Sequence, residues 1–176
     1  DITFPEIGNV GGVSYDEVSK KLRASQSSFT SPSTVYLIDE STWKTTQIYR
    51  EDVKLNTKDI ESKFVYYPSK DGTKIPMYLV YKKGLKLDGN NPTMLYGYGG
   101  FNVGISPRFI GSTASFIQRG GVYAWAGLRG GDEFGEEWHK AGMLDKKQNV
   151  FDDCIAAAEY LIKEKYTNPQ RLALKG

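Results

Sequence analysis

The sequence is short of the residues that many active sites and cross-links require. It holds one cysteine, Cys154, and one histidine, His139, among 176 residues. A single cysteine excludes an internal disulfide framework and any multi-cysteine zinc site. A hydrophobic core must therefore hold the fold together, and any chemistry within this chain has one imidazole to work with.

Long apolar runs and a strong charge of one sign are also missing. No stretch reaches the roughly 18 consecutive apolar residues of a membrane span. The 23 Lys+Arg residues against 21 Asp+Glu give a net charge of +2. We therefore expect no membrane association and no nucleic-acid partner.

The beginning of the sequence has no features of a targeting peptide. Residues Asp1–Glu6 contain neither a basic segment nor an apolar run, and no Met precedes them. We read the chain as an internal piece of a longer one. Sparing use of cysteine favours a cytoplasmic protein, with the periplasm open for a bacterial source.

Three motifs that would indicate a bound cofactor or a catalytic nucleophile are absent. The loop Tyr96–Phe101 fails the G-x-G-x-x-G fingerprint because Asn102 stands where the third glycine belongs. No Gly-Lys-Ser/Thr triplet forms a P-loop, and no G-x-S-x-G presents a serine. We therefore expect no cofactor. The last predicted strand stops at the point where an α/β-hydrolase makes the sharp strand-to-helix turn that presents its nucleophile.

Residues 1–53 are predicted to form short antiparallel strands. Val35–Asp39 and Thr45–Tyr49 are rich in β-branched and aromatic residues, whereas Ser25–Ser33 has the composition of a turn rather than of a helix or strand. Such a unit buries little by itself, so we interpret it as the end of a larger all-β layer such as a β-propeller. We place the domain boundary near residue 53, in a charged segment without periodicity.

Residues 54–176 change to alternating strands and helices, with Asp71-Gly72 as a hairpin signal. The expected strands are Lys63–Pro68, Lys74–Lys82, Thr93–Tyr96, Gly121–Ala126 and Arg171–Lys175, and the expected helices are Arg108–Arg119 and one that begins near Asn149 and ends before Thr167. This order predicts an open α/β sheet with parallel crossovers. Ligands bind at the carboxyl ends of such strands, and 12 of the 19 glycines lie between Gly97 and Gly142 in those loops.

The clearest predicted helix is the one that begins near Asn149. Its apolar residues at spacings of three and four predict the buried face: Phe151, Cys154, Ile155, Ala158, Leu161 and Ile162. Asn149 is the expected N-cap, and Asp152 and Asp153 are interpreted as first-turn charges rather than a catalytic pair. Cys154 is expected to be buried and inert.

Two glycine loops and the single histidine are candidates for function. The loop Tyr96–Phe101 either aims a backbone N–H or a tyrosine hydroxyl at a developing oxyanion, or is a tight turn with packed aromatic residues. Arg129, at the start of the second loop, either binds an anion or a peptide or pairs with a nearby acid: Asp132, Glu133, Glu136 or Glu137. His139 is interpreted as structural, because no second histidine completes a metal site.

Several long strings of the sequence resemble the prolyl oligopeptidase family, serine peptidases with a β-propeller and an α/β-hydrolase domain. The strings are YPSKDGTKIPM (Tyr67–Met77), KKGLKLDG (Lys82–Gly89), LYGYGGFN (Leu95–Asn102), LRGGDEFGEEWHKAG (Leu128–Gly142), KQNVFDD with AAEYLIKEKYTNP (Lys147–Pro169), and, for the last propeller blade, SFTSPSTVYLID (Ser28–Asp39). The resemblance implies an α/β fold: the N-terminal half of an α/β-hydrolase sheet (54–176), preceded by antiparallel strands from the end of a β-propeller (1–53).

The resemblance also implies cleavage of short peptides on the carboxyl side of proline. Tyr98, the second tyrosine of YGYGGF, would stabilise the oxyanion, and Phe101 would form a wall of the pocket for the substrate proline ring. Phe101 and the Trp138-His139 pair favour proline over basic-residue specificity. The family's catalytic Ser, Asp and His lie beyond this chain, so we expect the chain alone to be inactive and its parent to be monomeric, without cofactor or metal.

The sequence departs from the family pattern at Asp132, where a third glycine usually stands. Aspartate tolerates unusual backbone angles, so we expect this loop to keep its shape. Two other functions stay open. The first alternative to a prolyl peptidase is a non-catalytic peptide-binding or interaction protein that kept the fold. The second is another α/β-hydrolase, such as an esterase.

Overall fold

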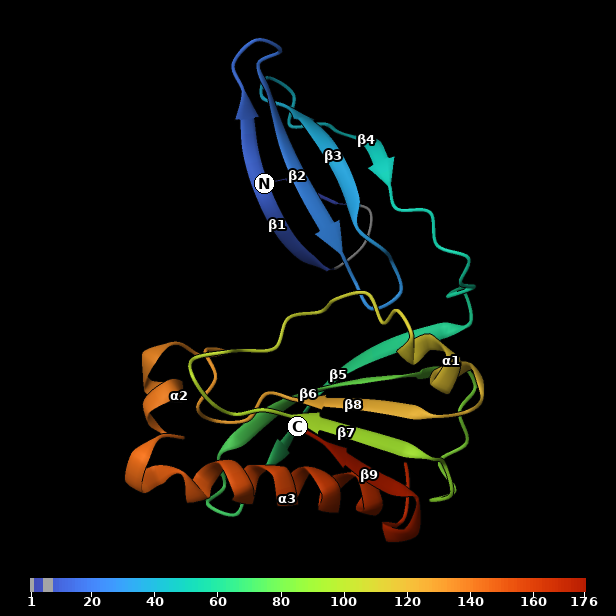
Figure 1. The fold of residues 1–176 in the computed structure, drawn as a ribbon, viewed down its shortest axis with the longest axis vertical. Coiled ribbons are helices and arrows are strands. Elements are labelled where there is room, and N and C mark those ends of the chain that lie inside the picture. Colours follow the sequence, from blue (N-terminus) through green and yellow to red (C-terminus); the bar gives the residue numbers. More distant parts are fainter. Residues whose placement is uncertain (1, 5–7) are drawn as a thin grey trace. The chain divides into compact units, whose positions relative to one another are not determined.

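A computed structural model describes residues 2–4 and 8–176; the segment searched for a targeting peptide lies partly outside these residues. The chain forms two compact units (Figure 1). The first comprises Asp1–Lys58 with Ser106–Gly111, and the second Asp59–Ile105 with Ser112–Gly176. The expected boundary at residue 53 lies ahead of the Lys58/Asp59 division, in the same segment between two strands. The residue at which one domain ends and the next begins stays a prediction.

The first unit contains a four-stranded antiparallel sheet in which neighbours in sequence are neighbours in the sheet (Figure 1). Its strands are β1 (Asn9–Asp16), β2 (Lys21–Ser27), β3 (Thr34–Asp39) and β4 (Thr45–Arg50). The two predicted strands are confirmed as β3 and β4. The prediction of a turn from Ser25 onward is wrong at its start, because Ser25 and Gln26 pair with Val35 and Thr34. Pairing with β3 overrides the local preference of serine for turns.

β3 has one buried face in this unit. Thr34, Tyr36 and Ile38 are buried while the residues between them are half-exposed, the period of two expected of a strand with one covered face. The ring of Phe4 packs edge-on against Tyr36 at 5.4 Å between centroids. β1 and β4 remain almost wholly exposed, so this sheet buries little apolar surface.

The second unit contains a five-stranded mixed sheet in the order β5-β6-β8-β7-β9. Its strands are β5 (Ile60–Pro68), β6 (Lys74–Lys82), β7 (Thr93–Gly97), β8 (Val122–Ala126) and β9 (Leu172–Lys175). β5 and β6 form the predicted hairpin, and Gly72 in its turn has a φ of +82°. β7 runs parallel to both β8 and β9, so the predicted α/β sheet with parallel crossovers is confirmed.

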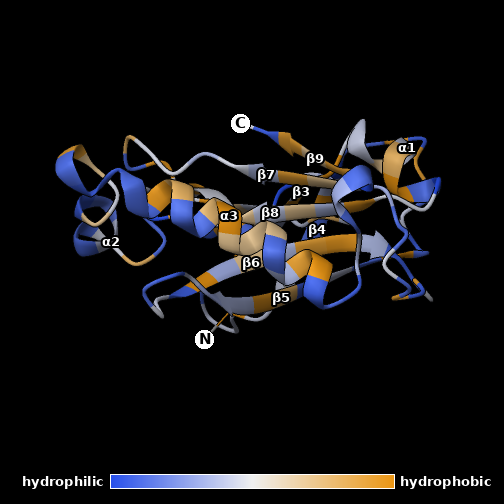
Figure 2. Cartoon of the chain, turned by 90° about the horizontal axis from the view of Figure 1, so that it is seen from below, coloured by the Kyte–Doolittle hydropathy of each residue, from blue (hydrophilic) through white to orange (hydrophobic). Residues whose placement is uncertain are grey.

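Helices cover both faces of this mixed sheet (Figure 1). They are α1 (Thr113–Gln118), α2 (Glu136–Lys140), α3 (Gln148–Lys163) and the 3₁₀ turns Leu144–Lys146 and Pro169–Arg171. α1 lies on one face and the long α3 on the other, and Figure 2 shows α3 crossing the sheet. The helix predicted from Arg108 begins only at Thr113. Gly111 has a φ of +49°, and the N–H of Ile110 donates to Phe29 O rather than to a helical carbonyl.

The core of the second unit lies between the sheet and α3. Its sheet residues are almost completely buried: Ile75, Met77, Leu79, Leu95, Val122 and Ala124. On α3 the buried face is Val150, Asp153, Ala156, Ala157 and Leu161. The predicted face is therefore wrong in part, since Phe151 and Ile155 are exposed and Cys154 is half-buried. Burial also raises the pKa of the Cys154 thiol.

The start of α3 differs from the predicted cap. Lys147 is the N-cap residue, and Asn149 lies inside the first turn, where its side-chain amide donates to Ala141 O at 2.8 Å. Asn149 thus anchors the preceding segment rather than capping the helix. The first turn contains no acidic residue, so the interpretation of Asp152 and Asp153 as first-turn charges is wrong.

Candidate functional site

Two glycine-containing loops meet at the carboxyl ends of the neighbouring parallel strands β7 and β8. A Cβ on Gly97 would stand 2.7 Å from Leu128 Cδ1, and one on Gly99 would stand 2.9 Å from Arg129 O. Gly99 also has a φ of +58°. Only glycine fits this close approach and this backbone conformation, so the sequence allows the two loops to pack directly against each other.

The carbonyl oxygen of Gly130 connects the second loop to the first loop and to His139. Gly130 O accepts the N–H of Asn102 at 3.1 Å and faces His139 Nδ1 at 2.9 Å. Because a carbonyl oxygen can only accept, Nδ1 is the donor of this hydrogen bond. His139 therefore fixes the second loop, in agreement with its interpretation as a structural residue.

Tyr98 and Phe101 both project from the first loop. Phe101 has a φ of +52° and is 85% exposed, and Tyr98 is 47% exposed. Their rings lie 6.4 Å apart between centroids and are inclined by 30°. Within the described residues the Tyr98 hydroxyl makes no hydrogen bond, so it is available as a donor beside a flat apolar surface.

A cavity of about 500 Å³ adjoins this loop. It is lined by Gly100, Phe101, Asn102, Gly130, His139, Gly142, Met143, Leu144 and Lys147. Phe101 is thus both an exposed surface residue and a wall of a cavity, whereas Tyr98 is not part of the lining.

A buried ion pair lies behind the second loop. Arg129 donates through Nη2 to Asp153 Oδ1 at 2.6 Å and through Nη1 to Asp71 Oδ2 at 2.6 Å. Asp153 is fully buried, accepts the Arg129 backbone N–H at 3.1 Å, and also accepts the Ser69 hydroxyl at 2.6 Å. This network joins α3, the β5–β6 hairpin and the loop after β8.

The charges of this network are stabilised by each other. Burial alone would lower the pKa of Arg129, but the hydrogen bonds to Asp153 and Asp71 outweigh it and raise that pKa. The hydrogen bond from Arg129 lowers the pKa of Asp71 to about 2. The guanidinium is fully occupied and its side chain is 5% exposed, so it does not bind an external anion or peptide.

The predicted acidic partners of Arg129 were wrong. Instead of a neighbour in the same loop, its partners are Asp153 and Asp71, which lie 24 and 58 positions away in the sequence. Such distant pairing leaves no local signal. Asp132 does not have a positive φ, and the two residues of this loop that do are glycines, Gly130 with a φ of +96° and Gly135 with a φ of +79°.

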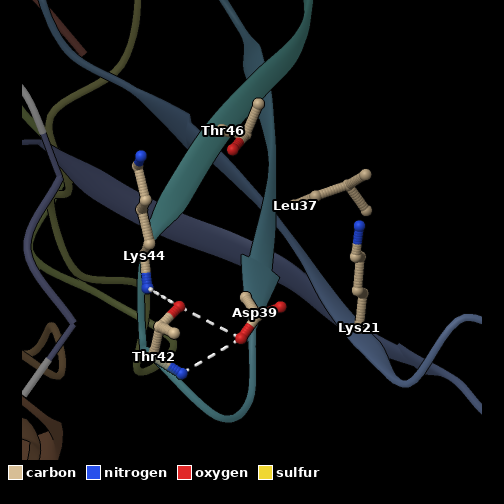
Figure 3. Close-up of a pocket in the computed structure, with 6 residues that line it drawn as sticks. All are labelled: Lys21, Leu37, Asp39, Thr42, Lys44 and Thr46. Atoms are coloured by element: carbon tan, nitrogen blue, oxygen red, sulfur yellow. Dashed lines mark hydrogen bonds between the residues drawn. The ribbon is translucent and has the colours of Figure 1, made fainter.

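A smaller cavity, of about 230 Å³, lies on the four-stranded sheet of the first unit, and its lining includes Lys21 and Lys44 (Figure 3). Its one carboxylate, Asp39, accepts the Ser41 hydroxyl and the Thr42 N–H of the β3–β4 turn. These hydrogen bonds, that of Ser41 foremost, lower the pKa of Asp39 to about 2. Asp39 therefore stabilises the β3–β4 turn, and its carboxylate is occupied by these hydrogen bonds.

In residues 2–4 and 8–176, no group of three or more His, Cys, Asp or Glu side chains could hold a metal ion. None of the helices in this part of the chain has the length and apolar character needed to cross a membrane.

Comparison with known proteins gives consistent similarities. The model of the prolyl oligopeptidase family matches residues 107–176. A prolyl endopeptidase of Elizabethkingia meningoseptica is 43% identical over 99% of the chain, and prolyl oligopeptidase A of Galerina marginata is 46% identical over 84%. The alignments cover 25% and 21% of these relatives, so the chain spans about a quarter of their length.

Solved structures show the same similarity in three dimensions. A prolyl endopeptidase structure superposes over 98% of the chain and 26% of its own length, with a TM-score of 0.93 and 48% identity. Prolyl oligopeptidase B of Galerina marginata, bound to a 35mer hydrolysis and macrocyclisation substrate, superposes over 95% of the chain and 24% of its own length, with a TM-score of 0.86 and 39% identity. The mixed sheet corresponds to the first part of an α/β-hydrolase domain and the antiparallel strands to part of a β-propeller.

Proposed function

Since this chain belongs to the prolyl oligopeptidase family, we propose that it is a segment of a serine endopeptidase that hydrolyses short peptides on the carboxyl side of proline. In this proposal the chain supplies an oxyanion-stabilising hydroxyl and a wall of the proline pocket. The catalytic Ser, Asp and His belong to the part of the longer protein that this chain does not cover, and the chain alone is inactive.

The observation that carries the proposal is the pairing of Tyr98 with Phe101 on one loop. The loop leaves the carboxyl end of β7, where α/β sheets bind their ligands. The Tyr98 hydroxyl has no partner among the described residues, and the two rings lie 6.4 Å apart. A donor and a flat apolar surface thus stand next to each other, as cleavage beside a proline ring requires.

Each side chain has a distinct chemical part. A carbonyl oxygen gains negative charge when a serine attacks it, and the Tyr98 hydroxyl donates a hydrogen bond that strengthens as this charge develops. Tyrosine suits the task because a phenol is neutral at working pH and can donate without losing its proton. Phe101 offers its ring to the proline side chain, which is apolar and has no polar group to satisfy.

The test uses the full-length protein with a fluorogenic peptide that contains proline and a matched peptide with alanine in its place. We expect Tyr98→Phe to lower kcat by about 100- to 1000-fold with little change in KM, the usual effect of losing one oxyanion donor. Tyr96→Phe is the matched control, because it removes a hydroxyl two residues earlier, in β7, and should leave kcat unchanged. Phe101→Ala should raise KM for the proline peptide more than for the alanine peptide.

Other outcomes would assign another function. Binding of prolyl peptides without turnover would favour a non-catalytic binding protein, and hydrolysis of esters alone would favour an esterase. Turnover by the isolated 176 residues would contradict the assignment of the nucleophile to the rest of the protein.

A further inference from the structure

One cationic side chain reaches the loop that carries Tyr98 and Phe101. Lys147 Nζ donates to Gly99 O at 2.7 Å and would stand 3.7 Å from a Cβ on Gly100. Lys147 is half-buried. In the described part of the chain no carboxylate forms an ion pair with it, and its ammonium instead donates to this carbonyl.

The backbone of Lys147 is itself well anchored. Its N–H donates to Leu144 O at 3.1 Å, and its carbonyl accepts the N–H of Val150 at 3.1 Å. Lys147 is the N-cap residue of α3, whose buried face packs in the core. The ammonium is therefore presented from a rigid element rather than from a loose loop.

The peptide unit that Lys147 contacts also packs against the backbone of the second loop, where a Cβ on Gly130 would stand 2.7 Å from Gly99 O. This peptide unit joins Gly99 to Gly100, two residues without side chains, and glycine has the widest choice of backbone conformations. A hydrogen bond from a charged donor is roughly twice as strong as one between neutral groups. The contact therefore selects one orientation of the Gly99 carbonyl, directly between Tyr98 and Phe101.

We propose that Lys147 is a positioning residue for this loop. Its ammonium holds the Gly99 carbonyl and thereby places the Tyr98 hydroxyl where the substrate oxygen gains charge. Lys147 acts through Tyr98 and touches neither the substrate nor the reacting atoms. The catalytic consequence rests on the proposed function, whereas the effect on the loop does not.

The kinetic test compares three variants of the full-length protein. Lys147→Met keeps the length and apolar contacts of the stem but removes the ammonium, Lys147→Arg keeps a charged donor, and Lys146→Met removes the neighbouring exposed charge as a control. We expect Lys147→Met to lower kcat for a prolyl peptide by about 10- to 100-fold, since a displacement of about 1 Å can cost about 100-fold. KM should change by less than about twofold, Lys147→Arg should recover most of the loss, and Lys146→Met should match the unmodified protein.

A double variant tests whether Lys147 acts through Tyr98. If it does, Lys147→Met should cost little once Tyr98→Phe has removed the hydroxyl, because residues that act as a unit are not additive. Multiplicative losses in the double variant, or an unchanged kcat in Lys147→Met, would overturn the proposal.

Hydrogen–deuterium exchange supplies a readout that does not depend on activity. Lys147→Met should accelerate exchange in peptides covering Tyr98–Val103 and leave the β5–β6 hairpin unchanged. Acceleration throughout the protein would indicate a general loss of stability and overturn the positioning role, as would unchanged exchange in the loop. An unmodified protein without turnover of prolyl peptides would refute the proposed function, and the exchange result would still decide the role of Lys147.

Discussion

The two sheets of this chain differ in strand order and in how deeply their strands are buried. In the four-stranded sheet each strand pairs with its neighbour in sequence, β1 and β4 are almost wholly exposed, and the buried hydrophobic residues are few. In the five-stranded sheet the order β5-β6-β8-β7-β9 requires crossovers, and its central strands β6 and β8 are largely buried, with helices on both faces of the sheet.

The difference shows what a parallel sheet adds. Turns in the antiparallel sheet satisfy their own polar groups, as Asp39 does with Ser41 and Thr42. Parallel strands instead bring loops from distant parts of the sequence to one edge. There the buried Arg129–Asp153 pair anchors the loop after β8, whereas Tyr98 and Phe101 on the neighbouring loop are exposed. The polar groups that stabilise the fold and those available for chemistry are thereby separated.

The largest expected effect is on the buried ion pair of the second unit. Asp153→Ala should lower the free energy of unfolding by about 3–5 kcal/mol, because it leaves the buried charge of Arg129 without its main partner. Asp152→Ala is the matched control, one position away and partly exposed, and should cost less than about 0.5 kcal/mol. Urea unfolding followed by circular dichroism measures both. Equal losses would show that the pair does not set the stability of this unit.

An intermediate effect is expected in the core of the first unit. Ile38 is 1% exposed, and Ile38→Ala should cost about 2–5 kcal/mol, towards the low end because so small a core can partly relax around the gap. Ile48→Ala, at a position that is 48% exposed, is the control and should cost far less. Hydrogen exchange should locate the loss in β1–β4. A loss spread equally over β5–β9 would argue against two separately stabilised units.

The smallest expected effect is a pH dependence at the exposed end of the ion-pair network. The pKa of Asp71 falls from 3.8 to about 2 in the folded protein, so the unfolded chain binds the extra proton between these values. The stabilisation is complete above pH 3.8 and disappears as the pH falls through about 2. Because the Asp71 side chain is 49% exposed, solvent screening limits it to about 1 kcal/mol or less.

Asp71→Asn checks this pH dependence. The difference in unfolding free energy between the two proteins should be present at pH 5 and vanish near pH 2. A difference that stays constant across this range would mean that the Asp71 charge contributes nothing to it.

The sequence predicted the elements whose signals are local. Asp71-Gly72 predicted the β5–β6 hairpin, and the β-branched and aromatic residues of Val35–Asp39 predicted β3. It failed where the cause lies elsewhere in the chain. Ser25 is in a strand because β3 lies beside it.

The site divided in the same way. Tyr98 and Phe101 were singled out by family resemblance, and their catalytic roles stay predictions. The partners of Arg129 could not be predicted from spacing, because Asp153 lies 24 positions away in the sequence. A helix pattern scored by apolar residues also misplaces a face on which a buried aspartate stands among alanines, as Asp153 does on α3.

The pairing of β9 with β7 has a consequence for the order of folding. Thr93 pairs with Leu172, about 80 positions away, whereas every pairing in the first unit joins neighbouring strands. Closing so long a loop costs chain entropy before the contacts repay it. We therefore expect the hairpins to form early and β7, the strand that leads to Tyr98, to gain β9 as its second neighbour only late in folding.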